Sequence, residues 1–113
     1  MGFNFFGFLK RKPEVHPYYQ KQYDIAKILN DTHRFCGGHR DSIQKSNLVG
    51  CFYCCQIYPA KEVNEWIDEI NGIGQTALCP KCGIDSILGD YDVKILDKEF
   101  LEKMRTRWFG NVK

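Results

Sequence analysis

Four of the six cysteines form two matched pairs, and these pairs are the clearest chemical pattern in the chain. Two residues separate Cys51 from Cys54 and Cys79 from Cys82, and twenty-four residues lie between the pairs. Two intervening residues let one tight turn direct both sulfurs to the same point, and Zn²⁺ takes four thiolates in a tetrahedron. Paired Cys-x-x-Cys motifs of this kind are typical of zinc sites. The pattern predicts one structural zinc ion held by these four residues.

The residues around the second pair are suited to a tight metal-binding turn. Gly83 follows Cys82 directly, and such turns tend to need a residue that tolerates positive φ. Pro80 restricts the backbone of the same turn. Backbone amides in the turn can also donate hydrogen bonds to the sulfurs and disperse the thiolate charge. We therefore expect two knuckles, each a Cys-x-x-Cys turn, to close over a single ion.

Cys55 offers an alternative ligand. The spacing from Cys51 to Cys55 would also permit binding, but the symmetry of the two pairs favours Cys54. Other chemistries for these cysteines are a redox dithiol, a rubredoxin-type iron site and disulfides. A redox Cys-x-x-Cys is expected as one pair at the head of a helix. Rubredoxin-type iron sites favour glycine after both pairs, where this chain has Cys55, so zinc is the favoured interpretation.

Cys36 lies between two histidines, His33 and His39, at intervals that metal ligands can use. A second metal site here would need a fourth ligand, which the local sequence does not supply. The favoured interpretation is an interior thiol beside two ordinary polar histidines.

Little in the sequence favours catalysis. A site closed by four cysteines leaves the metal no coordination position for water, so it could not act as a Lewis acid. A nuclease of the histidine-metal type would need histidines near the knuckles, but residues 55–78 and 83–113 contain none. Asp85-Ser86 after the second knuckle and Asp90-Tyr91-Asp92 further on could be read as acid/base or metal carboxylates. We instead expect Asp85 or Ser86 to bond the backbone of the second turn, as such residues often do. We therefore expect a protein that is not an enzyme.

The charge balance gives little support to nucleic-acid binding. Sixteen basic residues face fourteen acidic ones, which leaves a net charge of +2. The segment between the cysteine pairs also carries four carboxylates that would repel phosphate, namely Glu62, Glu65, Asp68 and Glu69. A protein partner is therefore favoured, and nucleic-acid binding is the alternative.

The length of the chain is that of one domain with a short appendage. Residues 1–17 form an aromatic and basic leader, and residues 18–113 are expected to be a single zinc-binding domain with its metal module at residues 39–88. The leader could dock on a membrane or a partner, but we favour packing of its phenylalanines on the domain. No apolar run is long enough to span a membrane, and the leader's apolar residues precede its basic ones, unlike those of a signal peptide. We expect a cytoplasmic protein with reduced thiols.

Apolar periodicity predicts the elements that position the knuckles. Helices are expected at residues 18–31, 60–70 and 98–109, a short helix at 39–46, and strands at 48–53 and 75–78. In the segment 60–70, apolar residues recur at helical spacing, namely Val63, Trp66, Ile67 and Ile70. Asp97 is the expected N-cap of the last helix.

These elements predict a small α+β fold in which the 60–70 helix crosses a pair of knuckles and amphipathic helices flank the module. The expected core consists of Trp66, Ile67, Ile70, Leu101, Met104 and Trp108.

Residues 39–88 combine the motifs CFYC, EWID and CPKCGIDS, and this combination resembles a set of small bacterial and phage-borne zinc-binding proteins. The resemblance implies a zinc-ribbon-like or treble-clef-like module and a cytoplasmic location. It implies no particular activity, and residues 1–38 lie outside it.

Taken together, the residues favour a non-catalytic structural-zinc protein that acts as a protein–protein interaction module. An immunity-type or phage accessory factor would be an example. The alternative is a zinc-ribbon protein that binds nucleic acid.

Overall fold

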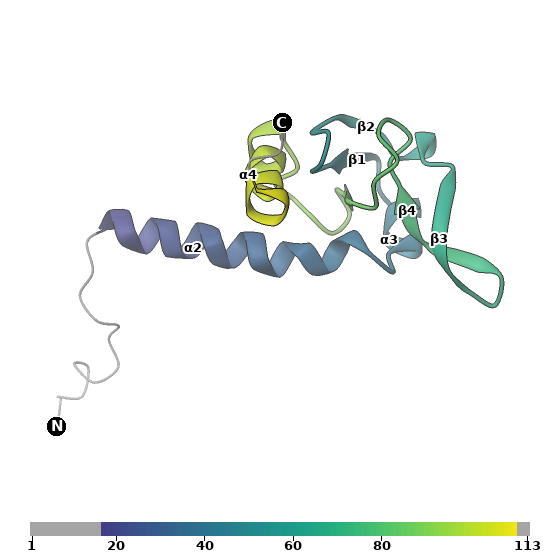
Figure 1. Ribbon diagram of the computed structural model, residues 1–113, viewed down its shortest axis with the longest axis horizontal. Helices are drawn as coiled ribbons and strands as arrows, with labels where there is room; N and C mark the ends of the chain where they lie inside the picture. The colour runs from purple at the N-terminus through teal and green to yellow at the C-terminus, as the bar shows by residue number, and fades with distance from the viewer. Residues whose placement is uncertain (1–16, 111–113) are drawn as a thin grey trace, which may run out of the picture.

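Short antiparallel strands in the middle of the chain lie beside two longer helices from its ends (Figure 1). The computed structural model describes the backbone of residues 17–110 and the side chains of residues 24–110. The elements include two short 3₁₀ helices, labelled η. In chain order, the elements are α2 (Pro17–Thr32), η1 (His33–Cys36), α3 (Arg40–Gln44), β1 (Leu48–Cys51), β2 (Ile57–Pro59), η2 (Ala60–Glu62), β3 (Glu65–Ile70), β4 (Ile73–Leu78), β5 (Ile87–Gly89) and α4 (Lys98–Phe109). This mixture of helices and antiparallel sheets confirms the predicted α+β class. The predicted leader lies outside the described residues, apart from Pro17.

The strand β1 is the centre of a three-stranded antiparallel sheet with the order β2-β1-β5. It is buried along most of its length, and the helix α4 packs closely against it. A Cβ atom at Gly50 would lie 2.9 Å from Leu101 Cδ1, so a larger residue at this position would have to displace the Leu101 side chain of α4. The close packing places the end of β1, where the first cysteine pair begins, against the core.

The segment predicted as an α-helix at residues 60–70 is instead the short 3₁₀ helix η2 followed by the strand β3, so that prediction was wrong. The strand β3 pairs with β4 in a separate two-stranded sheet, in which Trp66 lies opposite Ala77. The two strands are joined by Asn71 and Gly72, whose φ angles are 54° and 81°. Two successive left-handed residues of the Asn-Gly type form the tight turn that best matches strand twist in hairpins. This turn signal and the strand preference of Trp66 outweigh the helical spacing.

The two long helices were predicted correctly, since α2 and α4 match the expected ranges to within about a residue. Asp97 caps α4 as expected, and its carboxylate accepts a hydrogen bond of 2.8 Å from the amide of Phe100. Two side chains near the end of α4 reach α2. Arg107 Nε donates to Asn30 Oδ1 at 2.8 Å, and Trp108 Nε1 donates to the Leu29 carbonyl at 3.4 Å. No helix within residues 17–110 combines the length and apolar character needed to cross a membrane.

The core consists of two apolar clusters. The first surrounds α4 and contains Leu29, Phe52, Cys55, Leu88, Val93, Phe100, Leu101 and Met104. The second lies between the two sheets and contains Ile43, Val49, Cys51, Tyr58, Ala77, Cys79 and Ile87. Two of the metal-motif cysteines are therefore core residues of the second cluster.

The predicted core was only partly right. Leu101 and Met104 are fully buried, whereas Ile67, Ile70 and Trp108 are exposed by 38%, 63% and 38%. The two isoleucines are exposed because the hairpin projects from the rest of the molecule, which a packed helix at this position would not do (Figure 1). Trp66 is half-buried, and the guanidinium of Arg40 lies 4.6 Å from its ring centre.

His39 links η1 to β4 through both of its ring nitrogens. Its Nδ1 donates to the Phe35 carbonyl at 2.7 Å, and its Nε2 accepts a hydrogen bond of 3.1 Å from the Ala77 amide. Only a neutral imidazole can fulfil both roles. Neither nitrogen has a lone pair left for a metal, so the interpretation of His39 as an ordinary polar residue is favoured over a second metal site with His33 and Cys36.

We predict that the pKa of His39 lies below 6.5, its ordinary value. Burial lowers this pKa, and the contact with the Phe35 carbonyl and the charge of Asp92 only partly offset the effect. The pKa of His39 is lower in the folded protein than in the unfolded chain. The stabilisation by neutral His39 is therefore present above about pH 6.5, and it is lost as the pH falls through the pKa of His39 in the folded protein. An NMR titration of the metal-loaded protein measures the pKa directly. A value at or above 6.5 would contradict the neutral bridge.

Candidate metal centre

The two cysteine pairs follow the inner ends of strands from different sheets. Cys51 is the last residue of β1, and Cys79 comes directly after β4. Within each pair the amide two residues after the first cysteine donates to its sulfur, from Tyr53 to Cys51 Sγ at 3.4 Å and from Lys81 to Cys79 Sγ at 3.3 Å. These are the amide–sulfur hydrogen bonds expected of metal-binding knuckles.

The backbone repeats the same hydrogen bonds in both knuckles. The carbonyl of the first cysteine accepts from the amide four residues later, Cys55 in one knuckle and Gly83 in the other, at 2.7 Å in both. These two residues have left-handed φ angles of 59° and 82°. Cys55 therefore takes the position that glycine takes in the second knuckle. Its backbone closes the turn, while its side chain packs in the core cluster around α4.

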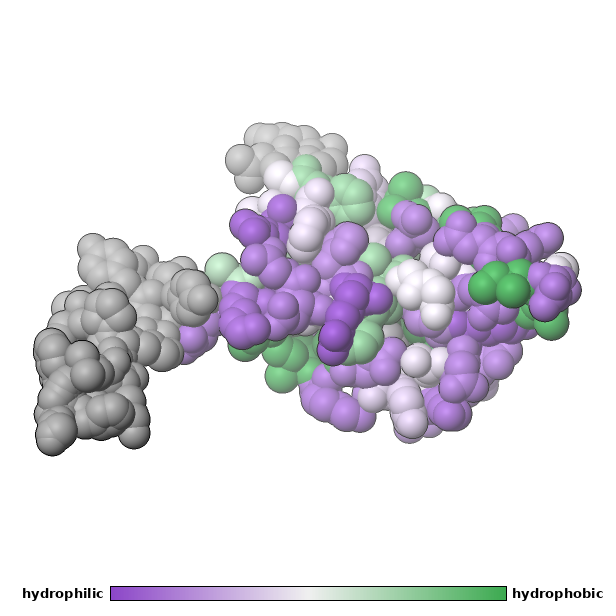
Figure 2. Space-filling view, turned by 90° about the horizontal axis from the view of Figure 1, so that it is seen from below, coloured by the Kyte–Doolittle hydropathy of each residue, from purple (hydrophilic) through white to green (hydrophobic). Residues whose placement is uncertain are grey.

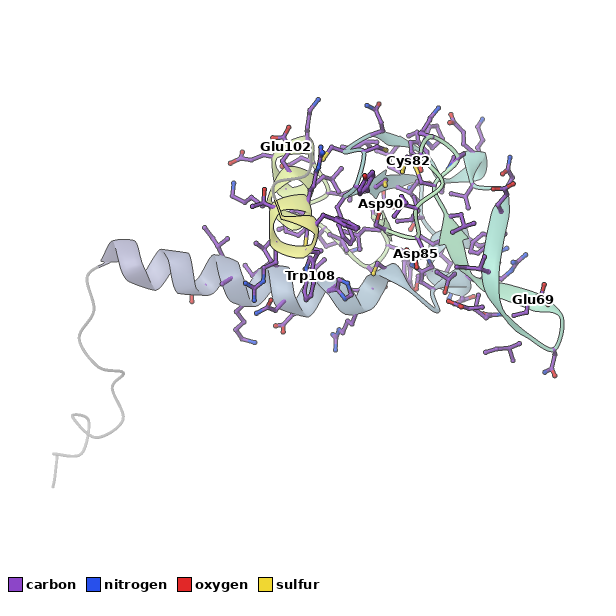
Figure 3. The ribbon with its side chains drawn as sticks, viewed as in Figure 1. Glu69, Cys82, Asp85, Asp90, Glu102 and Trp108 are labelled. Atoms are coloured by element: carbon purple, nitrogen blue, oxygen red, sulfur yellow. The ribbon has the colours of Figure 1, made fainter. Side chains whose placement is uncertain are left out.

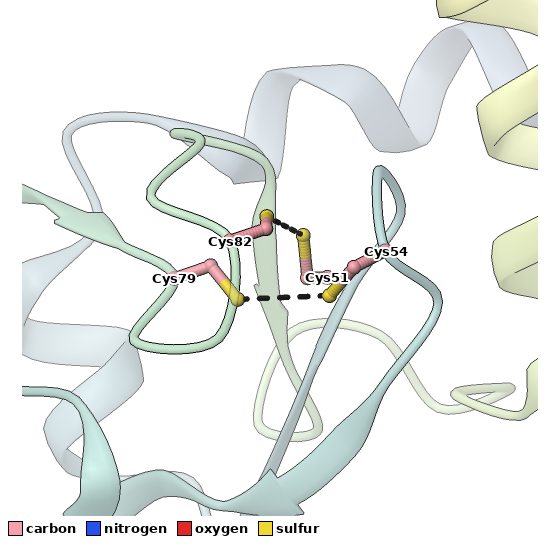
Figure 4. A group of neighbouring side chains, drawn as sticks. All are labelled: Cys51, Cys54, Cys79 and Cys82. Atoms are coloured by element: carbon pink, nitrogen blue, oxygen red, sulfur yellow. Dashed lines mark hydrogen bonds between the residues drawn. The ribbon is translucent and has the colours of Figure 1, made fainter. Parts of the chain in front are cut away.

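The knuckles bring four sulfurs together from positions far apart in the chain (Figure 4). The sulfurs of Cys51, Cys54, Cys79 and Cys82 all lie within 4.8 Å of one another. The Cys51–Cys82 and Cys54–Cys79 Sγ separations are 3.6 and 3.8 Å.

These separations match the edges of a metal–thiolate tetrahedron. With metal–sulfur bonds of ~2.3 Å, the edges of a regular tetrahedron are about 3.8 Å long. A disulfide would instead require about 2.05 Å between the two sulfurs. The four thiols thus fit a tetrahedral ion in both chemistry and spacing, and among residues 24–110 they are the only group of three or more potential ligands gathered this closely.

The site is embedded in the second core cluster. Cys51 and Cys79 are 0% and 1% exposed, whereas Cys54 and Cys82 are half-buried. Two neighbouring hydroxyls lie against the buried sulfurs. Tyr58 Oη donates to Cys79 Sγ at 3.0 Å, and Ser86 Oγ lies 3.3 Å from Cys51 Sγ. Hydrogen bonds of this kind orient metal ligands and disperse their charge.

The site favours ionisation of one thiol and opposes it at two others. Burial tends to raise the pKa of Cys79, but hydrogen bonds from the Tyr58 hydroxyl and from the backbone outweigh it, so the net shift is downward. Burial, together with the charge of Cys51, raises the pKa of Cys54 to about 11 and also raises that of Cys82. A bound cation would compensate the thiolate charge, so metal binding is expected to release protons.

The structure places the other predicted residues away from this centre or in supporting roles. Cys54 joins the other three sulfurs and Cys55 does not, as the symmetry of the pairs predicted. Asp85 or Ser86 was expected to bond the turn's backbone. Among the described residues neither side chain does so, and Ser86 instead contacts the Cys51 sulfur. The contact of Tyr58 with Cys79 was not predicted. No local motif marks it, because the pairing of β2 with β1 places the tyrosine there.

No protein-family model matches this chain, and comparison with curated proteins and with solved structures finds no significant match. The interpretation of the site therefore depends on its geometry and chemistry.

We predict that Cys54→Ser loses the metal and Cys55→Ser keeps it. The first change removes one of four ligands, and the protein should lose cooperative folding because metal binding and folding are coupled. The second places a hydroxyl in an apolar site and should lower the free energy of unfolding by about 1 kcal/mol. Elemental analysis and thermal unfolding of both variants check this. Equal metal content in the two variants would contradict the assignment of Cys54.

Proposed function

We propose that this chain is a non-catalytic structural-zinc protein whose folded surface binds another protein. The observation that carries the proposal is the closed group of four cysteine sulfurs, two of them fully buried, at the junction of the two sheets. We further propose that the knuckles belong to the zinc-ribbon or treble-clef type, with one ion per chain.

The donor set supports zinc as the ion. Four thiolates in a tetrahedron select Zn²⁺ or iron among the common biological metals. Zinc has no redox chemistry and no geometric preference beyond the tetrahedron, so it suits a site that only joins two turns.

The closed coordination supports a structural role. A catalytic zinc keeps a position for water or substrate, usually beside three protein ligands. Here four sulfurs supply all four positions. The hydroxyls of Tyr58 and Ser86 contact the sulfurs and so act on the ligands. The arrangement therefore favours a folding role for the ion over Lewis-acid chemistry.

The β3–β4 hairpin supports a protein partner. It presents exposed isoleucines at and near its tip, Ile70 and Ile73 being 63% and 52% exposed. Figure 2 shows apolar side chains among polar ones at the end of the molecule that holds this hairpin. Exposed carboxylates occur on the same strand, at Glu65 and Glu69. Apolar residues bordered by polar ones are characteristic of protein interfaces, whereas the carboxylates disfavour a phosphate backbone.

The lysine within the second knuckle gives little support to nucleic-acid binding. Lys81 Nζ lies 3.2 Å from Glu62 Oε1, and it also stands over the ring of Tyr58 at 5.3 Å. Its charge is thus partly compensated within the protein. This arrangement makes nucleic-acid binding the weaker alternative.

We predict that Ile70→Ser/Ile73→Ser abolishes capture of the protein partner, since these side chains would otherwise be desolvated in the complex. Ile95→Ser is the matched control, because Ile95 is 51% exposed but lies outside the hairpin. Tagged, zinc-loaded wild type and both variants would be used as bait, with nuclease treatment and a salt series, and captured proteins would be quantified by mass spectrometry.

The expected result is one specific protein captured by the wild type and by Ile95→Ser, resistant to nuclease and salt, and lost with the hairpin variant. Retention of nucleic acid alone, with binding that weakens steeply as salt rises, would reject the proposal in favour of the alternative.

A further inference from the structure

A hollow of about 300 Å³ lies behind the metal centre, where η1, the hairpin, the chain after the second knuckle and the end of α4 meet. We call it the acidic hollow. The residues that characterise it are His33, Asp68, Thr76, Asp85, Trp108 and Phe109. In Figure 3, Asp85 and Trp108 lie towards the centre of the molecule, whereas Glu69 lies out on the hairpin.

The charge of the hollow comes from two carboxylates. Asp68 and Asp85 line it, and none of the described lining residues is a lysine or arginine. Within the described part of the chain, neither carboxylate takes part in a hydrogen bond or ion pair. Cys36 also lines the hollow but adds no charge, because burial, and then the nearby charge of Asp85, raises the pKa of its thiol.

Aromatic rings form another part of the lining. The rings of His33 and Trp108 lie 4.0 Å apart between centroids, and Phe52 and Phe109 are in contact at 5.7 Å. All four residues line the hollow. Aromatic faces attract cations, and the attraction is stronger where water is partly excluded.

The backbone departs from regular geometry to place Asp68 in this lining. Ile67 and Thr76 are register partners and so share a face of the hairpin. In a regular strand Asp68 would lie on the opposite face. Its φ of 60° interrupts the alternation, and Asp68 and Thr76 line the same hollow. Left-handed backbone is unfavourable for most residues other than glycine, although aspartate tolerates it better than most.

Thr76 adds a buried hydroxyl oxygen to the lining. It is only 2% exposed, and its Oγ1 accepts a hydrogen bond of 2.8 Å from the Gly38 amide. A hydroxyl oxygen has two lone pairs, so one remains at Thr76 Oγ1 to accept a hydrogen bond from a bound donor.

We propose that the acidic hollow binds the guanidinium group of an arginine side chain presented by the protein partner. A planar guanidinium can stack on aromatic rings while its N–H groups donate to carboxylates, which a lysine ammonium does less well. This site would be part of the partner-binding surface proposed above. The proposal rests on that function only for the source of the arginine, which is the protein partner.

The test uses blocked amino acids as probes, so it does not require the partner. Zinc-loaded, ¹⁵N-labelled full-length protein would be titrated with N-acetyl-arginine amide, and NMR would follow the Trp108 indole and the amides of Cys36 and Ser86. Saturable shifts with a dissociation constant in the millimolar range are expected for such a small ligand. N-acetyl-lysine amide should bind more weakly, and N-acetyl-citrulline amide, which is neutral and nearly the same shape, should not bind.

Asp68→Asn and Asp85→Asn should each weaken arginine binding by about threefold or more, since each removes one charge from the pair. Asparagine also tolerates the left-handed backbone at position 68. Glu69→Gln is the matched control, because it removes the next carboxylate on β3, which does not line the hollow. Unchanged spectra elsewhere would confirm that each variant is folded.

Three results would overturn the proposal: no saturable shift with the arginine probe, equal binding of the citrulline probe, or equal loss in Glu69→Gln and Asp68→Asn. Tighter binding of free L-arginine than of the blocked form would show that the ligand is a metabolite and not a side chain of a partner. None of these results affects the capture experiment with the hairpin variant. The proposed protein partner and the proposed arginine site can therefore fail separately.

Discussion

The convergence of four cysteine sulfurs is the interaction on which the rest of this structure depends. The three-stranded sheet and the β3–β4 hairpin share no strand pairing, yet the first knuckle begins at the end of one and the second follows the end of the other. Cys51 and Cys79 are also members of the apolar cluster between the two sheets. An ion held by both knuckles would therefore join the sheets at their inner ends. A module of this size buries too little apolar surface for high stability, so a metal contribution to folding is expected.

The hydrogen bonds around the sulfurs show how the polypeptide supports such an ion. Each knuckle supplies an amide to its first sulfur, and the Tyr58 and Ser86 hydroxyls supply contacts from outside the knuckles. These contacts come from β2 and from the chain leading into β5, the two neighbours of β1. Formation of the sheet and ordering of the sulfurs are thus coupled. The segment leading into β5 also carries Asp85 at the acidic hollow, so the four-cysteine group and the surface that we propose for recognition share this segment.

Local signals were enough to predict the knuckles and the C-terminal helix. The Cys-x-x-Cys spacing identified the four clustered cysteines, and the N-cap at Asp97 marked the start of α4. The segment with Trp66 and Ile70 was misassigned because its apolar residues fit a helical period, while the Asn71–Gly72 turn that specifies a hairpin was overlooked. Long-range contacts such as that of Tyr58 with Cys79 leave no trace in spacing. The left-handed backbone angles of Cys55 and Asp68 were not predicted, because they follow from the turn and the hairpin in which these residues lie.

X-ray absorption at the metal edge of the purified protein tests the central claim most directly, because it reports the identity of the ion and its first shell together. The account predicts a zinc edge with four sulfur neighbours at ~2.3 Å and no nitrogen or oxygen in the first shell. Iron in place of zinc, or a first shell containing nitrogen or oxygen, would contradict a closed zinc site. A metal-free protein that folds cooperatively would contradict the dependence of the fold on the ion.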